Sequence, residues 1–477
     1  MNKLKLFVEN FLVYGLGGII SKMIPLIMVP IVTRIMPTTD YFGISDLSNT
    51  IVSFGCAIAV MGMYDAMYRM FFEKDDENYK RKVCSTALVF TLATSIIVFL
   101  IMLILKDVIA QYFFSDCQYA YLVYLSAMAT LVGATNAIIS APTRMQNKRK
   151  VFLITNTVSP LLSYSISIPM LWAGHYVIAL PLASVISGMT MEFAFGMMNR
   201  NWFRPRLFDK KILAQLLVIA IPLLPNFLIY WVFNSCDKVM ITNMIGIGEA
   251  GIYSVGAKLG LASQLIYIAF AGGWQFFAFS TMKDKNQVET NSRIFEYLGV
   301  ISFIATSFIC AWSFAIFKIL FTQDYLSGYV VAPYLFLAPL MQMLFQVAAN
   351  QFLVIKKTWP NMFVLSVGAV LNIIFNYFLI PVLGIEGASI ATLLGYVVSD
   401  IVCVIVLWRM NLMVVSERFI KSSLIMVGFM IAWRLLFSDL FIIGTVAAVM
   451  LTAVMILLYY DEVKKITNMI KNKKVKV

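Results

Sequence analysis

Charged side chains inside long apolar stretches are the residues of this chain best suited to chemistry. A charge in the hydrocarbon of a bilayer costs about 2.5 to 3.5 kcal/mol, so each one needs water, a partner or a ligand. Counted along the apolar stretches, the cations fall in the middle and outer half, and several carboxylates lie deeper. The set comprises Lys22, Arg34, Asp65, Glu192, Asp237, Lys238, Lys258 and Asp400.

The cations of this set suit an anionic ligand. Lys22, Arg34 and Lys258 could together hold a phosphate, because ammonium and guanidinium groups donate charge-assisted hydrogen bonds to its oxygens. The alternative is that these long side chains extend to the lipid headgroups and bind nothing. The sequence therefore predicts a cavity that binds an anionic substrate group, with headgroup contacts as the competing interpretation.

Uncharged polar residues recur at helical spacing in two apolar segments. Gln342, Gln346 and Asn350 follow one another every four residues, and Asn136 and Ser140 stand about 210 residues earlier in the same pattern. One face of each helix is therefore polar. We expect these faces, with Asn136, Gln346 and Asn350, to line a wet cavity, and hydrogen bonds between helices are the alternative.

The carboxylates of the set are candidates for coupling transport to an ion gradient. Asp65, Glu192, Asp237 and Asp400 all lie in predicted membrane helices, which is the only reason for this hypothesis. Asp65 also stands four residues before Arg69, so an ion pair along the helix is the competing interpretation.

Asp237 and Lys238 are adjacent and opposite in charge. Neighbouring residues on a helix point about 100° apart, so the two side chains need different surroundings. Their distance from the basic residues Lys210 and Lys211 places both near the outer end of a long helix. We predict an outer gate there, with Asp237 facing the cavity or Arg34, and Lys238 reaching headgroups or substrate.

The elements that must position these residues follow from composition. The chain has 477 residues, of which 61% are hydrophobic and 13% charged, with a mean hydropathy of +0.85. Soluble domains are about 25% charged, so this is an all-α polytopic membrane protein, with about fourteen transmembrane helices at roughly 20 apolar residues each. They are expected near residues 11–36, 43–70, 84–106, 118–141, 152–173, 176–199, 214–246, 250–278, 296–319, 328–354, 361–383, 385–409, 419–437 and 440–460.

The basic residues predict the orientation. Alternate loops hold most of the 37 Lys and Arg residues, and the intervening loops hold none. Lys and Arg mark cytoplasmic loops, so both termini are expected in the cytoplasm. The net charge of +13 is then explained by the orientation of the protein in the membrane and by contact with anionic lipids of the inner leaflet. No nucleic-acid partner is expected. The opening MNKLKLF is assigned to the first helix, because its apolar run continues to Met36 without the cleavage site of a signal peptide.

The chain repeats itself at an offset of about 210 residues. Thr33–Ser45 (TRIMPTTDYFGIS) is similar to Thr242–Ser254 (TNMIGIGEAGIYS), with one gap. Six crossings separate the copies, so two parallel six-helix bundles are expected, at residues 1–205 and 206–412. Residues 413–477 add two helices and a basic tail. In transporters with such repeats the substrate site is central, between the halves.

Prolines occur in the first helix of each half, at Pro25 and Pro30 and again at Pro222 and Pro225. Proline kinks there are expected to let these helices bend.

Several kinds of chemistry find no support in the sequence. The six cysteines are scattered without C-x-x-C spacing, His175 is the only histidine, and G-x-x-x-x-G-K-[ST] does not occur. We therefore expect no catalytic residues, no metal, no cofactor and no direct use of ATP.

These residues resemble a known family. IPLIMVPIVTRIMPTTDYFGISDL, GMYDAMYRMFF and PLLPNFLIYWVFNSCDKVMITNMIGIGEAGIYSVGAKL are similar to the polysaccharide transporters, the Wzx-type flippases, of the multidrug/oligosaccharidyl-lipid/polysaccharide exporter superfamily. The resemblance implies two six-helix bundles around a V-shaped cavity that opens to either side in turn. The implied cargo is an undecaprenyl-diphosphate-linked oligosaccharide, moved from the cytoplasmic to the outer leaflet of the bacterial inner membrane.

This implied cargo agrees with the residues. Lys22 and Lys258 could hold the diphosphate, and Gln346 and Asn350 could hydrogen-bond the glycan. Membrane lipids would surround the protein, and the candidate protein partners are a polysaccharide polymerase and glycosyltransferases.

Three other functions remain as alternatives. A lipid II or spore-envelope-type flippase would share the helix count. A multidrug exporter of organic cations should favour carboxylates over cations in its cavity, whereas this chain offers both. A membrane polymerase or glycosyltransferase would need a sizeable outer loop, and every outer loop predicted here is short.

Overall fold

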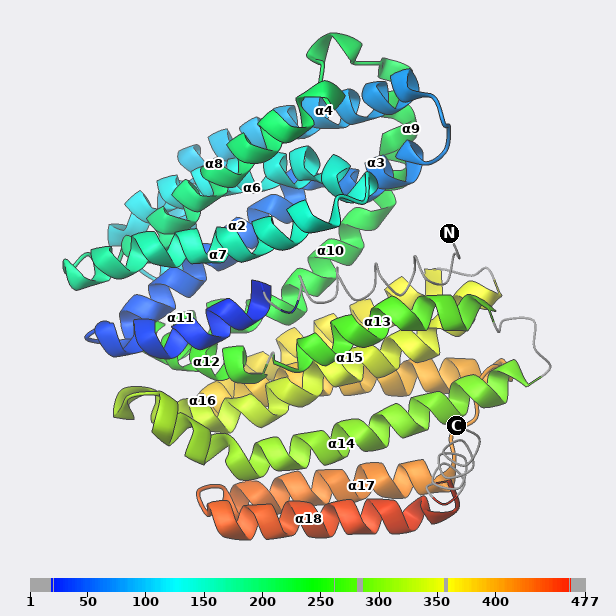
Figure 1. Cartoon of the computed structure of the whole chain (residues 1–477). Coiled ribbons are helices and arrows are strands. Elements are labelled where there is room, and N and C mark those ends of the chain that lie inside the picture. The colour runs from blue at the N-terminus through cyan, green and yellow to red at the C-terminus, as the bar shows by residue number, and fades with distance from the viewer. Residues whose placement is uncertain are drawn as a thin grey trace. The chain divides into compact units, whose positions relative to one another are not determined.

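The computed structural model describes residues 19, 21–260, 262–280, 286–355, 359–462 and 464, and every regular element in them is helical (Figure 1). Residues 21–35 are helical and precede α2. The other α-helices are α2 Thr39–Val60, α3 Met63–Phe71, α4 Glu77–Ile104, α5 Lys106–Phe114, α6 Ala120–Met145, α7 Arg149–Trp172, α8 Ala179–Asn199, α9 Lys210–Ala220, α10 Leu224–Trp231, α11 Asp237–Ile245, α12 Ile247–Gly260, α13 Ser263–Ser280, α14 Gln287–Leu320, α15 Val331–Val354, α16 Trp359–Arg409, α17 Glu417–Ala432 and α18 Phe441–Leu458. The predicted all-α membrane class is confirmed.

Eleven helices in the described part of the chain are long and apolar enough to cross a membrane. The first expected helix begins outside the described residues. The expected helix over 250–278 is divided into α12 and α13. The helices expected at 361–383 and 385–409 both lie within α16, on either side of Gly384, whose non-helical φ of 60° separates them. The count of fourteen therefore stays a prediction.

The helix expected over 214–246 is divided where its sequence disfavours a regular α-helix. Pro222 lies in a 3-10 turn, Ile221–Leu223, between α9 and α10, because a proline lacks the N–H and clashes with the preceding turn. A π-helical turn, Val232–Cys236, then separates α10 from α11. Such a turn changes the direction in which the following side chains point, and Asp237 follows it directly.

The described chain forms two compact units. Unit 1 comprises Met1–Val255 and Ile373–Ala388, and unit 2 comprises Gly256–Asn372 and Ser389–Val477. These limits do not follow the repeat boundary expected after residue 205, so the division into two six-helix halves and two added helices stays a prediction.

Unit 1 is built around α6, which packs against α2, α4 and α8. Its buried apolar side chains gather in two clusters. One lies among α3, α4, α6 and α9 and includes Met67, Cys84 and Leu216. The other lies among α2, α5 and α6 and includes Ile44 and Leu122. Large apolar residues thus fix α2 and α3 at opposite ends of the same unit.

Unit 2 is organised by α14 and α15. The helix α15 is almost entirely buried, and α14 packs against α15, α17 and α18 (Figure 1). The approach of α18 is close, because a Cβ on Gly444 would lie 3.1 Å from the Cα of Ala311. The two C-terminal helices therefore pack against α14.

Within unit 1, α2 and α12 cross with their backbones in contact. A Cβ added to Gly43 would collide with the carbonyl oxygen of Ile247, and one added to Gly251 would collide with that of Thr39. In each case the obstructing carbonyl belongs to the residue four positions before the other glycine. Each added Cβ would also lie 3.1 Å from the other glycine's nitrogen. The crossing is thus symmetric, and both glycines belong to the repeated motif.

Replacing either glycine should therefore destabilise the protein. We expect Gly43→Ala or Gly251→Ala to lower the free energy of unfolding by about 1 to 3 kcal/mol, because the new methyl groups force the helices apart. Thermal unfolding in detergent measures the effect. Gly196→Ala in α8 is the control, since a Cβ there would meet no atom within 4 Å, and alanine favours a helix. Wild-type melting temperatures for both variants would contradict the close crossing.

Candidate functional site

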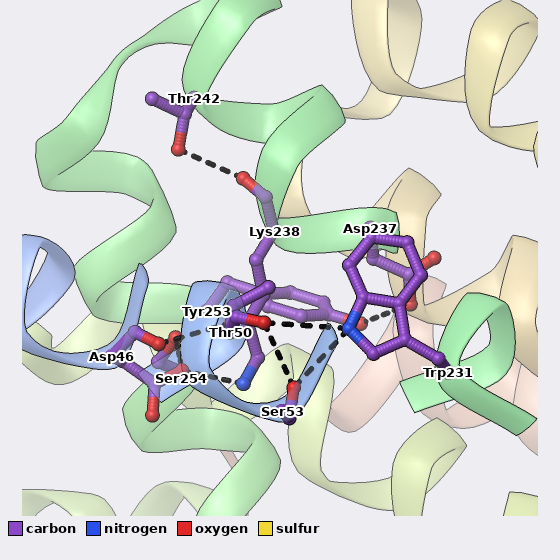
Figure 2. Close-up of polar contacts among 9 residues, drawn as sticks. All are labelled: Asp46, Thr50, Ser53, Trp231, Asp237, Lys238, Thr242, Tyr253 and Ser254. Carbon is purple, nitrogen blue, oxygen red and sulfur yellow. Dashed lines mark hydrogen bonds and ion pairs between the residues drawn. The ribbon is translucent and has the colours of Figure 1, made fainter. Parts of the chain in front are cut away.

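A buried polar cluster lies where α2, α11 and α12 meet in unit 1 (Figure 2). We call it the charged cluster. Its members are Asp46, Asp237, Lys238, Tyr253, Ser254 and Asn376.

The first half of the charged cluster is an ion pair. Lys238 Nζ from α11 lies 2.5 Å from Asp46 Oδ2 of α2. Ser254 Oγ of α12 donates a hydrogen bond of 2.8 Å to the same oxygen. Asp46 is only 5% exposed, so its charge is compensated by protein groups on two other helices.

The second half surrounds Asp237, which is 2% exposed. Tyr253 donates its hydroxyl to Asp237 Oδ2 at 2.6 Å, and Asn376 Nδ2 donates to Oδ1 at 2.6 Å. The two adjacent residues of α11 therefore have different surroundings, as the 100° step along a helix requires. The adjacent residues Tyr253 and Ser254 of α12 likewise serve one carboxylate each.

A second set of contacts connects α10 to α2 beside the cluster (Figure 2). Trp231 Nε1 donates to Ser53 Oγ at 3.2 Å and to the carbonyl oxygen of Thr50 at 3.4 Å. Its ring packs against Phe54, with centroids 4.8 Å apart. Thr242 Oγ1 donates to the carbonyl oxygen of Lys238 at 2.8 Å. Side-chain hydrogen bonds therefore hold the chain on both sides of the π-helical turn, at Trp231 before it and at Thr242 after it.

One expectation about this region differs from the structure, and four residues of the cluster were not expected. Lys238 was expected to reach headgroups or substrate, but its ammonium group lies against the buried Asp46. Sequence reasoning also missed Asp46, Ser254, Tyr253 and Asn376. One signal was available for two of them, because Asp46 follows the first copy of the repeated motif and Ser254 ends the second. The role of an outer gate stays a prediction.

The other predicted cavity residues are divided between the units. Lys22 and Arg34 are exposed in unit 1, and Asn136 is half-buried there. Lys258, Gln346 and Asn350 lie in unit 2. Lys258 and Gln346 are half-buried there, and Asn350 is buried.

The uncharged members of this set have unsatisfied polar atoms. Asn136 Oδ1, Gln346 Oε1 and Asn350 Nδ2 are buried and have no hydrogen-bond partner among the described residues. Hydrogen bonds between helices therefore do not satisfy these three atoms, which leaves them free for water or a ligand.

The carboxylates suggested for ion coupling differ in their surroundings. Asp65 is exposed, and no ion pair joins it to Arg69 in the described residues. Glu192 accepts a hydrogen bond of 2.5 Å from Thr135 Oγ1. Asp400 is 7% exposed, and neither of its oxygens has a partner within the described part of the chain. Its role in coupling stays a prediction.

Metal-binding side chains are not grouped in the described residues. Nowhere in them do three or more His, Cys, Asp or Glu side chains lie close enough together to hold an ion. The cysteines are free thiols, buried or half-buried except for the exposed Cys117.

Comparison with known proteins decides the family. The model of a family described as polysaccharide biosynthesis protein matches residues 31–331. The chain belongs to this family. No curated protein matches its sequence. The matched range includes α2, α11 and α12, and so nearly all of the charged cluster.

Solved structures show the fold. A lipid II flippase, MurJ, in an inward-closed conformation has 14% identity and a TM-score of 0.72, covering 95% of this chain and 100% of its own. An inward-facing MATE-family multidrug resistance transporter of the MOP superfamily has 14% identity and a TM-score of 0.61, with 83% and 98% covered. The MATE multidrug transporter DinF-BH has 15% identity and a TM-score of 0.62, with 86% and 96% covered.

This member of the polysaccharide biosynthesis family is therefore a multi-pass membrane protein with a MurJ/MATE-like fold. The family resemblance expected from the sequence is confirmed.

The ion pair of the charged cluster should contribute strongly to stability. We expect Lys238→Ala or Asp46→Ala to lower the free energy of unfolding by about 3 to 5 kcal/mol, because each leaves one buried charge without its partner. The double variant should lose less than the sum of the two. Thermal unfolding of the four proteins in detergent gives the coupling energy.

The matched control is Arg293→Ala, which removes an exposed ion pair with Glu289 one helical turn away. Its effect should stay below about 1 kcal/mol. Additive effects of the two cluster substitutions would show that Lys238 and Asp46 do not interact.

Proposed function

We propose that this protein is a transporter, namely a flippase for an undecaprenyl-diphosphate-linked oligosaccharide. It would move its cargo from the cytoplasmic to the outer leaflet of a bacterial inner membrane by alternating access, with both termini in the cytoplasm. The match to the polysaccharide biosynthesis family over residues 31–331 carries this proposal. The fold it shares with a lipid II flippase supports a lipid-linked cargo.

The proposed substrate contacts combine cations with uncharged polar groups. Lys22, Lys258 and Arg34 would bind the diphosphate through charge-assisted hydrogen bonds. Asn136 and Asn350, each with a buried polar atom that has no partner in the described chain, would bind glycan hydroxyl groups, together with Gln346. A polymerase and glycosyltransferases would use or supply the same lipid-linked glycan and are the proposed protein partners.

Deletion of the gene should abolish surface polysaccharide and cause the lipid-linked oligosaccharide to accumulate inside the cell. The double variant Lys22→Ala/Lys258→Ala, expressed at wild-type level, should lower export at least tenfold by removing two cations from the diphosphate site. Surface polysaccharide and extracted lipid-linked glycan are measured together. Lys318→Ala, at an exposed lysine near the end of α14, is the control.

The two parts of this experiment test different claims. Normal surface polysaccharide in the deletion strain would overturn the flippase assignment. Normal export by the double variant would refute only the proposed diphosphate contacts of Lys22 and Lys258.

The likeness to a lipid II flippase favours a second candidate, lipid II itself. Depletion distinguishes the two cargoes. A lipid II flippase is needed for the cell wall, so its depletion should stop growth and cause lipid II to accumulate. A flippase dedicated to surface polysaccharide should leave growth intact when the sugar pathway is also blocked upstream.

We further propose that membrane carboxylates couple transport to an ion gradient, with Asp400 the leading candidate because its two buried oxygens lack partners in the described residues. In proteoliposomes, wild-type transport should change with an imposed proton or sodium gradient. Asp400→Asn should remove that dependence, whereas Asp439→Asn, at an exposed carboxylate before α18, should keep it. Wild-type transport that ignores both gradients would refute the coupling.

A further inference from the structure

The exposed face of α3 carries three aromatic rings at four-residue spacing. The centroids of Tyr64 and Tyr68 are 6.1 Å apart, and those of Tyr68 and Phe72, the residue directly after the helix, are 5.5 Å apart. Tyr68 is 37% exposed and Phe72 58%. We call these three residues the aromatic ladder.

Charged residues lie beside the ladder on the exposed side of α3. Asp65 and Arg69 each follow a tyrosine of the ladder, and both are exposed. Neither forms an ion pair within the described residues. Tyrosines are also common where helices meet the membrane surface. A face turned to lipid, however, would not carry two charges without partners, since each costs several kcal/mol there. The ladder therefore belongs to a surface that meets water.

The neighbouring helix α6 extends this polar surface. Arg144 Nη1 donates a hydrogen bond of 3.2 Å to the hydroxyl of Tyr64. Arg144 also stands four residues after Ser140 and eight after Asn136, so all three lie on one face of α6. The polar stripe predicted from the sequence and the aromatic ladder thus meet at Arg144.

The other end of the ladder opens into a pocket. A cavity of about 560 Å³ lies between α3 and α9, which are side by side in Figure 1. Small-molecule sites typically occupy about 300 to 1,000 Å³. The pocket is lined by Arg69, Met70, Phe72, Glu73, Gln215, Val218 and Ile219.

This combination of groups fits a carbohydrate. A sugar ring has an apolar C–H face, which packs against the electron-rich face of an aromatic ring. It also has a rim of hydroxyl groups, which act as both donors and acceptors. Carboxylates such as Asp65 and Glu73 accept from such hydroxyls, Arg69 donates to them, and the amide of Gln215 does both.

We propose that the aromatic ladder and the α3–α9 pocket bind the glycan of the lipid-linked cargo. This site rests on the proposed function and specifies where the glycan of the substrate is recognised. Sugar rings stack on Tyr68 and Phe72, and hydroxyl groups bond to Asp65, Arg69 and Gln215. The lipid diphosphate is bound elsewhere, so recognition of the glycan is separable from recognition of the lipid.

Two lipids that differ only in the glycan test the proposal. One is the lipid-linked oligosaccharide extracted from source cells that lack this transporter, and the other is undecaprenyl diphosphate. Their affinities are measured for the full-length protein in lipid nanodiscs. Tyr68→Ala should weaken binding of the glycolipid by about tenfold, or about 1.4 kcal/mol, because it removes a ring on which a sugar stacks. It should leave binding of undecaprenyl diphosphate unchanged.

Three companion proteins sharpen the test. Tyr68→Phe keeps the ring and should stay within about twofold of wild type, whereas Phe72→Ala should behave like Tyr68→Ala. Tyr112→Ala, at a tyrosine of α5 that is 61% exposed, should bind both lipids normally. Melting temperatures confirm that each variant is folded.

The outcomes separate this site from the flippase assignment. Equal losses for both lipids, or no loss in Tyr68→Ala and Phe72→Ala, would overturn the glycan site while leaving the flippase assignment intact. Equal affinity of the wild-type protein for the two lipids would do the same. A wild-type protein that binds neither lipid would instead contradict the proposed function.

Discussion

The backbone contact between α2 and α12 is the constraint on which the charged cluster depends. Gly43 and Gly251 let the two helices touch without intervening side chains. Asp46 and Ser254 each lie three residues after one of these glycines, and so on the same face of their helices. Their hydrogen bond of 2.8 Å is therefore a continuation of the crossing. A larger residue at either glycine would separate the donor from the acceptor.

This arrangement places a lysine and two carboxylates where little water reaches them, which makes their geometry demanding. A buried ion pair rarely adds net stability over apolar packing, but the loss of one partner is costly. The cluster therefore acts mainly on specificity: α11 fits only in the register that directs Lys238 to Asp46 and Asp237 to Tyr253. The π-helical turn before Asp237 sets that register, because it changes the direction of every side chain that follows.

The sequence was sufficient for properties that depend on composition and repetition. Hydropathy predicts the all-α membrane class, and the motifs of Thr33–Ser45 and Thr242–Ser254 indicate the family. The helical step of 100° also predicts that Asp237 and Lys238 have different partners. The identities of those partners could not be predicted, since Asp46 and Lys238 are about 190 residues apart and a single sequence contains no information about such pairings.

Helix boundaries were predicted only in part. The break expected after residue 383 is present, since Gly384 inside α16 has a non-helical φ of 60°. Conversely, the helix predicted over 43–70 is divided into α2 and α3 at Met61 and Gly62, both of which have positive φ. Glycine tolerates that conformation, and Met61 adopts it as the left-handed C-cap of α2, with its N–H bonded to the carbonyl oxygen of Ala57.

The break at Gly62 also explains why α3 can present the aromatic ladder. A Cβ on Gly62 would lie 2.7 Å from the carbonyl oxygen of Ala220 and 3.2 Å from the Cβ of Leu223. These residues flank Pro222. The break between α2 and α3 therefore lies against the break between α9 and α10. Because α3 starts anew there, its exposed face is set by its own packing on α4 and α9 and not by the face that α2 buries. Asp46 is therefore buried and Tyr68 exposed although both belong to the one helix predicted over 43–70, because α2 and α3 turn different faces to the core.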